Sequence, residues 1–261
     1  MLGLSPATGV GSRQIANEPQ GRAATSGPGL PDLATANRIF YDRLWNRSRL
    51  VAPERFNTWP IVQPLLADGG DRLEVAPGLR PRLPIAGTYF ADISTHALAK
   101  LRLGGGLVTL AAATAIPFPD ARFRLLCALD IIEHLDDDDA GFAELSRLAV
   151  PGGTLLLSVP LHPSRWSVFD DIVGHRRRYE PDLLAGKLRQ HGFSIEGSAP
   201  FGMRPRSSRL ATYGMNLLAR HPAQGFWCYN NLLMPLAIRQ QRPLRLTNGL
   251  IAADAVDDLL L

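Results

Sequence analysis

Cysteine is scarce in this sequence, because only Cys127 and Cys228 occur among its 261 residues. So few thiols exclude a fold held together by disulfides, and their apolar neighbours predict two buried free thiols, as a reducing cytoplasm would keep them. Long apolar runs are also missing, since no stretch reaches the roughly 18 consecutive apolar residues of a transmembrane helix. The N-terminal stretch lacks the uninterrupted apolar core of a signal peptide. We therefore expect a cytoplasmic protein without a transmembrane segment.

A strong excess of charge of either sign is equally absent. Lysine and arginine total 28 and aspartate and glutamate 24, which gives a net charge of +4. The basic residues form no stripe interleaved with aromatic residues, so nucleic acid is not an expected partner. With 46% hydrophobic and 20% charged residues, the composition is typical of a globular protein with a sizeable core.

The chain divides by composition into an arm and a domain. Residues 1–33 are rich in Gly, Ala, Ser and Pro without hydrophobic periodicity, which predicts a disordered N-terminal arm. Residues 34–261 form the domain, which begins with an aromatic-bearing helix over 34–50 and a short helix over 59–66.

Apolar strands then alternate with segments of helical length. Strands are predicted over residues 72–76, 88–92, 107–112, 123–129, 154–159, 193–198 and 257–261, and helices over 140–148 and 182–190. This alternation predicts a mainly parallel sheet with helices on both faces. Continuous apolar runs such as TLLLSV support burial of the sheet on both sides.

The alternation breaks between residues 202 and 255. Aromatic and leucine residues interrupted by prolines predict a helical insertion, or lid, before the last strand. Its apolar segment 226–238 is expected in the core or at a homodimer interface, with a membrane-surface role as the alternative.

Three acidic residues mark the ends of predicted strands. Glu74 lies on the first strand, Asp92 ends the second, and Asp130 follows the fourth. Ligands of doubly wound sheets bind beyond the carboxyl ends of the strands, so these acids predict a ligand site there. A carboxylate in the position of Asp92 can accept hydrogen bonds from both ribose hydroxyls. One acid after a glycine loop would suit a nicotinamide enzyme equally well.

The ordered set of motifs resembles the class I S-adenosylmethionine-dependent methyltransferases, in particular their small-molecule branch. The motifs are LEVAPGLRP (73–81), YFADIS (89–94), AIPFPDARFRLLCALDIIEHL (115–135) and LAVPGGTLLLSVPLHP (148–163). The resemblance implies a Rossmann-like, doubly wound α/β sheet with an antiparallel last strand, and S-adenosyl-L-methionine as cofactor. Two departures stand out. Ala76 replaces the first glycine of the loop, and the acid that often contacts adenine is missing around Ala112–Ala113.

The resemblance also implies a role for each matching residue. Glu74 would orient the loop amides and the cofactor amino group, and Asp92 would bind the ribose. The remaining cofactor contacts would come from Ala76 and Gly78 at the methionine moiety, Ile93, Ala113 and Thr114 at adenine, and Leu129 and Asp130 at the aminocarboxypropyl group.

Catalytic and substrate residues are predicted from their positions after the fourth and fifth strands. His134 is the candidate general base, because an ordinary histidine titrates near neutrality, although Glu133-His134 could equally be structural. Asp130, Glu133 and His134 could instead hold Mg²⁺, which is what a resemblance to quinone-ring methyltransferases implies; no metal site is assigned. The acceptor pocket is expected to be lined by His162, Trp166, Asp170, His175 and Tyr179. The arginines at 176–178 form either an ion-paired face or a site for an anionic substrate.

These features predict methyl transfer to the oxygen, nitrogen or carbon of a small-molecule acceptor, in secondary metabolism or cell-envelope building. One alternative is a non-catalytic, degenerate binding protein of the same fold. The other is a nicotinamide oxidoreductase, which lacks support because no intact G-x-G-x-x-G is present.

Overall fold

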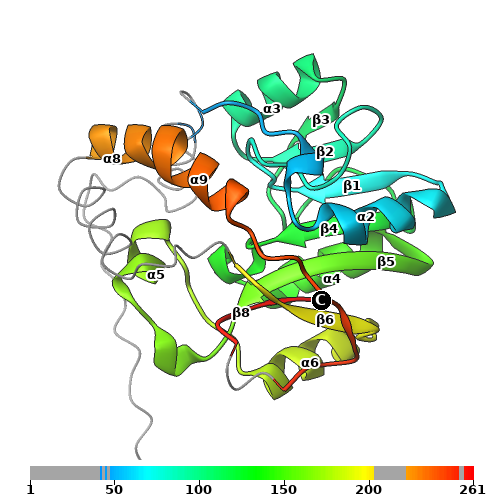
Figure 1. Ribbon diagram of the computed structural model, residues 1–261. Helices are drawn as coiled ribbons and strands as arrows, with labels where there is room; N and C mark the ends of the chain where they lie inside the picture. Colours follow the sequence, from blue (N-terminus) through cyan, green and yellow to red (C-terminus); the bar gives the residue numbers. More distant parts are fainter. Residues whose placement is uncertain (1–41, 43–44, 46–47, 203–221, 253–255) are drawn as a thin grey trace, which may run out of the picture. The chain divides into compact units, whose positions relative to one another are not determined.

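The computed structural model describes residues 42, 45, 48–202, 222–252 and 256–261 (Figure 1). Residues 1–32 form one unit of the chain and residues 33–261 another. The predicted arm and most of the predicted helix over 34–50 lie outside the described residues. Within that helix, Asp42 and Trp45 are helical.

A single sheet of eight strands organises the described part of the chain, in the order β3-β2-β1-β4-β5-β8-β6-β7. The strands are β1 (Arg72–Val75), β2 (Tyr89–Asp92), β3 (Leu107–Leu110), β4 (Phe123–Leu129), β5 (Ala149–Pro160), β6 (Gly197–Phe201), β7 (Thr247–Asn248) and β8 (Asp258–Leu260). The first five strands pair in parallel, and β8 lies antiparallel between β5 and β6. The predicted doubly wound sheet with an antiparallel last strand is confirmed.

Successive residues of β4 enter opposite cores, as the pleat of a strand requires. Leu126 and Ala128 belong to the cluster that contains residues of α4 and α6, while Leu125 and Cys127 pack with Val62 of α2. The sheet is therefore buried on both faces, which explains the continuous apolar runs of its central strands.

Helices cover the two faces of the sheet. The helices that follow or precede the first six strands are α2 (Trp59–Leu65), α3 (Thr95–Leu103), α4 (Asp138–Leu148), α5 (Val168–Val173) and α6 (Pro181–Gln190), with short 3₁₀ turns η1 (Pro53–Arg55), η2 (Leu66–Asp68), η3 (Ile132–His134) and η4 (Pro163–Arg165). The helix α3 begins at Ser94, whose hydroxyl accepts a hydrogen bond from the Ala97 amide. The helix α4 begins in the same way at Asp137, which accepts from the Ala140 amide.

The connection between β1 and β2 departs from a regular βαβ unit. Residues 76–88 contain turns and bends but no helix. Pro77, Pro81 and Pro84 lack amide donors, which disfavours an intact helical turn here.

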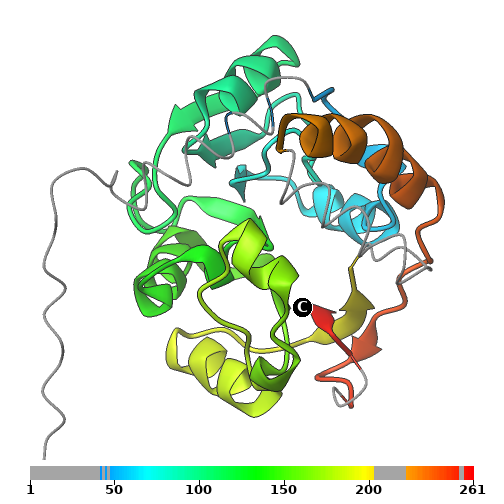
Figure 2. The same ribbon diagram turned by 90° about the vertical axis from the view of Figure 1, so that its left-hand side faces the viewer.

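The insertion before the last strand is helical in its described part. It contains α8 (Pro222–Cys228), the π-helical segment η5 (Tyr229–Leu233) and α9 (Met234–Arg239), which follow one another as a nearly continuous rod (Figures 1 and 2). Met234 and Ile238 pack against Phe56, so the rod is fixed beside η1. Residues 203–221 and 253–255 of the predicted insertion lie outside the described residues. None of the helices in the described part of the chain has the length and apolar character needed to cross a membrane.

Both cysteines are free thiols, as the sequence predicted. Cys127 is buried in β4, whereas Cys228 at the end of α8 is only half-buried.

Candidate functional site

Strained backbone marks the carboxyl ends of three neighbouring strands. Four described residues other than glycine have a positive φ, and three of them follow β1, β4 and β5: Ala76 at 49°, Asp130 at 54° and His162 at 60°. Such conformations cost an L-residue free energy and are concentrated at functional sites. The predicted ligand edge of the sheet is therefore also its strained edge.

Glu74 holds the β1–β2 connection in shape. Its side chain is buried, and its carboxylate accepts hydrogen bonds from the Arg82 amide at 2.8 and 3.0 Å and from the Leu83 amide at 2.9 Å. Burial raises the pKa of Glu74 to about 7, although these amides oppose the shift. Glu74 therefore orients the amides of residues 82 and 83.

Asp92 fixes the turn that follows β1. Its Oδ2 accepts a hydrogen bond from the Gly78 amide at 3.1 Å, and its Oδ1 accepts one from the Ser94 amide at 2.7 Å. Burial raises the pKa of Asp92 to about 6, against the effect of these two amides. The carboxylate of the second strand is therefore joined to the glycine loop of the first.

Gly78 is required at its position for two reasons. Its φ is +55°, and a Cβ there would lie 2.2 Å from the ring of Trp45. The buried Trp45 ring thus lies against the glycine turn, and the Arg80 guanidinium lies 5.0 Å from the centre of that ring. Sequence reasoning missed this contact, because nothing in the local pattern relates Trp45 to a turn 33 positions later.

The other predicted cofactor residues lie around the same edge. Ile93 is half-buried directly after Asp92, and Ala113 and Thr114 are half-buried in the turn that follows β3. The Ala111 amide donates to the Asp92 carbonyl at 3.1 Å, which brings this turn next to the end of β2. Leu129 is half-buried at the end of β4 and packs against the cluster on the α2 face.

Asp130 is oriented by a residue that sequence reasoning did not single out. The Ser158 hydroxyl donates to Asp130 Oδ1 at 2.6 Å, and the Asp130 amide donates to Ser158 Oγ at 3.0 Å. Ser158 lies opposite Leu129 in the β4–β5 register and is fully buried. The signal was present, since Ser158 is the polar residue within the apolar run TLLLSV.

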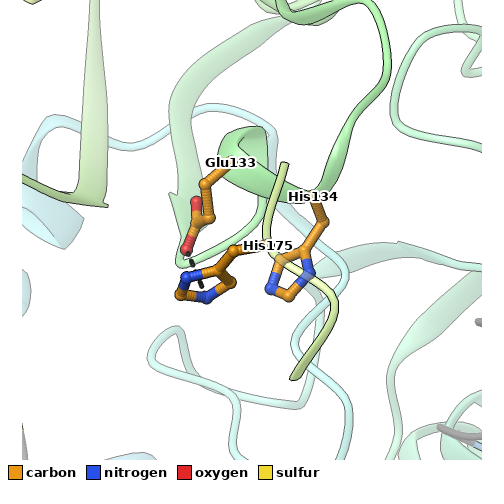
Figure 3. A group of neighbouring side chains, drawn as sticks. All are labelled: Glu133, His134 and His175. Carbon is orange, nitrogen blue, oxygen red and sulfur yellow. Dashed lines mark ion pairs between the residues drawn. The ribbon is translucent and has the colours of Figure 1, made fainter. Parts of the chain in front are cut away.

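Glu133, His134 and His175 lie together beside this edge (Figure 3). Figure 3 shows the Glu133 carboxylate pointing toward His175, with the two imidazole rings next to each other; the ring centres are 4.7 Å apart. Burial raises the pKa of Glu133 well above its ordinary value and lowers that of His134 to about 3. His134 is thus neutral and a weak base at physiological pH, which disfavours its predicted role as general base.

Asp170 is wholly enclosed by hydrogen-bond donors. Arg178 binds it with both arms, Nε to Oδ1 at 2.8 Å and a terminal nitrogen to Oδ2 at 3.0 Å, while the Ser167 hydroxyl and His175 Nδ1 each contact it at 2.8 Å. Burial would raise the pKa of Asp170, but these donors lower it to about 2. Asp170 holds these neighbouring side chains in place, and its burial leaves it inaccessible to a methyl-accepting substrate.

The remaining predicted substrate residues are dispersed. Tyr179 is buried, and its hydroxyl donates to Asp138 Oδ2 at 2.9 Å. Trp166 is exposed and donates to Asp171 at 3.0 Å, and His162 lies 3.8 Å from the Glu180 carboxylate. The structure therefore brings His175 and Asp170 together but places Tyr179 in the core.

The arginine run at 176–178 is an ion-paired face. Arg176 pairs with Asp136, Arg177 with Asp138, and Arg178 with Asp170. Asp138 is buried in this network. The alternative of an anionic substrate site formed by these arginines loses its support.

Comparison with known proteins agrees with this geometry. Residues 76–157 match the family model of a methyltransferase domain. No curated protein sequence matches the chain. Among solved structures, a possible histamine N-methyltransferase from Thermotoga maritima is 15% identical, with a TM-score of 0.54 over 86% of this chain and 97% of that chain.

Two further solved structures share the fold at similarly low sequence identity. A [4+2]-cyclase is 18% identical, with a TM-score of 0.50 over 77% of this chain and 78% of that chain. A candidate sarcosine dimethylglycine methyltransferase from Galdieria sulphuraria is 14% identical, with a TM-score of 0.50 over 78% and 83% of the two chains. At these identities the likeness concerns the fold. The family model therefore identifies a methyltransferase domain within residues 76–157, the part of the chain that carries Asp92 and Asp130.

Proposed function

We propose that this protein transfers a methyl group from S-adenosylmethionine to a small-molecule acceptor. The observation that carries the proposal is the alignment of three carboxylates, Glu74, Asp92 and Asp130, at the carboxyl ends of β1, β2 and β4. Each is fixed by hydrogen bonds from the loop or strand next to it. Sites fixed in this way can orient a ligand with little loss of conformational freedom.

The carboxylates at this edge offer hydrogen-bond acceptors that suit the ribose and the amino group of the cofactor. Each oxygen of Asp92 accepts one amide hydrogen bond, and a carboxylate oxygen has a second lone pair, so Asp92 can still accept from two ribose hydroxyls. Asp130 offers an acceptor for an amino group. Asp92 is only 4% exposed, so a ligand that binds it has to displace part of its surroundings.

When bound, S-adenosylmethionine supplies an electrophilic methyl group, so the protein has to bind, orient and exclude water. We assign ribose binding to Asp92, binding of the amino group to Asp130 with Glu74 holding the loop, and binding of adenine to the turn after β3. Ala76, Gly78 and Leu129 would contact the methionine part and Ile93, Ala113 and Thr114 the ring.

The acceptor is proposed to bind between the ends of β4 and β5. His162, Trp166 and His175 are the lining candidates there, while Asp170 positions His175 from behind. We assign no proton transfer to His134, because its pKa is near 3. The similar structures named for histamine and for sarcosine and dimethylglycine support a small acceptor.

Transfer of a labelled methyl group tests the proposal. The protein is incubated with methyl-labelled S-adenosylmethionine and a fractionated metabolite extract, and label is expected in a low-molecular-weight product. Asp92→Ala, which removes the ribose acceptor, should abolish the product. Tight cofactor binding without labelled product in any fraction would favour the non-catalytic binding protein instead.

A further inference from the structure

Glu133 is a buried carboxylate that lacks hydrogen-bond donors in the described part of the chain. The residue is 1% exposed, and neither of its oxygens accepts a hydrogen bond from any residue that the structure describes. His175 Nε2 lies 3.8 Å from its Oε1 (Figure 3). A buried carboxyl group without hydrogen-bond partners loses solvation whether it is ionised or protonated, and a bound cation would offset that loss.

The two neighbouring histidines, His134 and His175, have the same ring tautomer. His175 Nδ1 lies 2.8 Å from Asp170 Oδ1, and Asp170, whose two oxygens are bound by Arg178, acts as acceptor, so Nδ1 carries the proton. His134 Nδ1 lies 3.3 Å from the Gly174 carbonyl, which also only accepts. In both rings the lone pair is therefore on Nε2. Nδ1 held by a carboxylate or a backbone carbonyl, with Nε2 as the ligand atom, is the usual orientation of metal-binding histidines.

The backbone holds the three residues in place. The Arg176 amide donates to the Glu133 carbonyl at 2.7 Å, which fastens the segment carrying His175 to η3. Gly174 ends α5 in the left-handed conformation, with φ of 80°, and turns the chain toward η3. One ligand atom from each of Glu133, His134 and His175 lies within 4.8 Å of the others.

We propose that Glu133, His134 and His175 bind a divalent transition-metal ion, with Zn²⁺ as the best fit. Two imidazole nitrogens and one carboxylate oxygen suit Zn²⁺ and its first-row neighbours, whereas Mg²⁺ prefers oxygen ligands. At Zn–N and Zn–O distances of about 2.0–2.2 Å, the three atoms have to close in by roughly 1 Å. Three protein ligands leave a coordination position open for water or for an oxygen or nitrogen of an acceptor.

This site differs from the magnesium site that the sequence left open. Asp130 does not join the three ligands, because it is bound to Ser158. Its place is taken by His175, which follows 41 positions after His134 and has no sequence signal as a ligand. Two further carboxylates lie near the site: Asp130 acts on Glu133, and Asp170 contacts His175, while Arg178 offsets part of their negative charge.

Metal titration of the full chain, purified without a histidine tag and freed of metal by chelation, tests the proposal. Co²⁺ should give visible d–d absorption of a single site, and Zn²⁺ should displace it. Glu133→Gln and His175→Gln should weaken binding by roughly 100-fold or more, since each removes a ligand. The matched control is His191→Gln, because His191 stacks on Phe142 outside the site and should bind metal as the wild type does.

A variant that fails to fold would also lose metal binding, so a second measurement uses the wild type alone. In long-range ¹H–¹⁵N spectra, Zn²⁺ should shift the Nε2 resonances of two of the six histidines. Binding weaker than about 100 μM, equal binding by Glu133→Gln and wild type, or responses from other histidines would overturn the proposal. These readouts use neither cofactor nor acceptor, so they can fail or succeed independently of methyl transfer.

Discussion

The substitution Ala76→Gly tests whether the turn that follows β1 is strained. Ala76 has a φ of 49°, and the left-handed region costs an L-residue roughly 1–2 kcal/mol, which glycine does not incur. The greater freedom of glycine in the unfolded chain offsets about 0.4–1 kcal/mol of that gain. We therefore expect the free energy of unfolding to rise by between zero and about 1.5 kcal/mol, and each kcal/mol moves the Tm of a chain this long by roughly 2–4 °C.

Ala121→Gly is the matched control for this substitution. Ala121 has a φ of 48° but lies in the exposed turn before β4, where its amide donates to the Arg147 carbonyl. Both variants should gain similar stability in thermal unfolding. Only Ala76→Gly should bind S-adenosylhomocysteine more tightly, by roughly two- to tenfold in calorimetric titration. The substitution removes the Cβ of Ala76 from the turn where we expect the backbone to approach the ligand. Loss of stability in Ala76→Gly alone, or an equal change of Kd in both variants, would refute the reasoning.

Three further predictions follow from the buried polar contacts. The pKa of Asp92 is about 6, and only its ionised form accepts from both ribose hydroxyls. The Kd for S-adenosylhomocysteine should therefore be constant above pH 7 and rise by up to about tenfold per pH unit below pH 6. Calorimetry from pH 5 to 8 measures this dependence, and a Kd independent of pH contradicts it. Arg178→Met leaves the Asp170 charge buried without its main partner and should lower the free energy of urea unfolding by about 3–5 kcal/mol, so a loss below 1 kcal/mol would be inconsistent with the buried pair. Ser158→Ala removes the hydroxyl that orients Asp130 and should cost about 1 kcal/mol in stability and weaken cofactor binding several-fold; unchanged binding would show that Asp130 needs no such support.

Strand placement was predictable because the apolar runs are strong and short. The β1, β2, β3 and β4 strands begin within one residue of their predicted starts, since burial on both faces leaves a continuous apolar signal. The β5 strand begins at Ala149, earlier than predicted, because Ala149 pairs with Phe123 across an irregular register that the Pro-Gly-Gly segment obscured. The β6 strand begins at Gly197 rather than 193, because its pairing with β8 determines its bounds and its own pattern does not.

Site residues were predictable where they follow strands and not where they depend on distant contacts. The common position of Glu74, Asp92 and Asp130 was predictable because parallel strands align their carboxyl ends. The enclosure of Asp170 by Arg178, the contact of Trp45 with Gly78, and the burial of Tyr179 all join segments whose relation appears only in three dimensions. The neutral state of His134 is likewise set by burial and by the neighbouring His175, not by its own sequence context.

Calorimetric titration with S-adenosylhomocysteine, for the wild type and Asp92→Ala, tests the central claim most directly. A carboxylate at the end of β2, joined to the Gly78 turn, should give micromolar binding that Asp92→Ala abolishes. Absence of binding in the wild type, together with binding of NADH, would contradict the account and favour a nicotinamide enzyme on the same sheet.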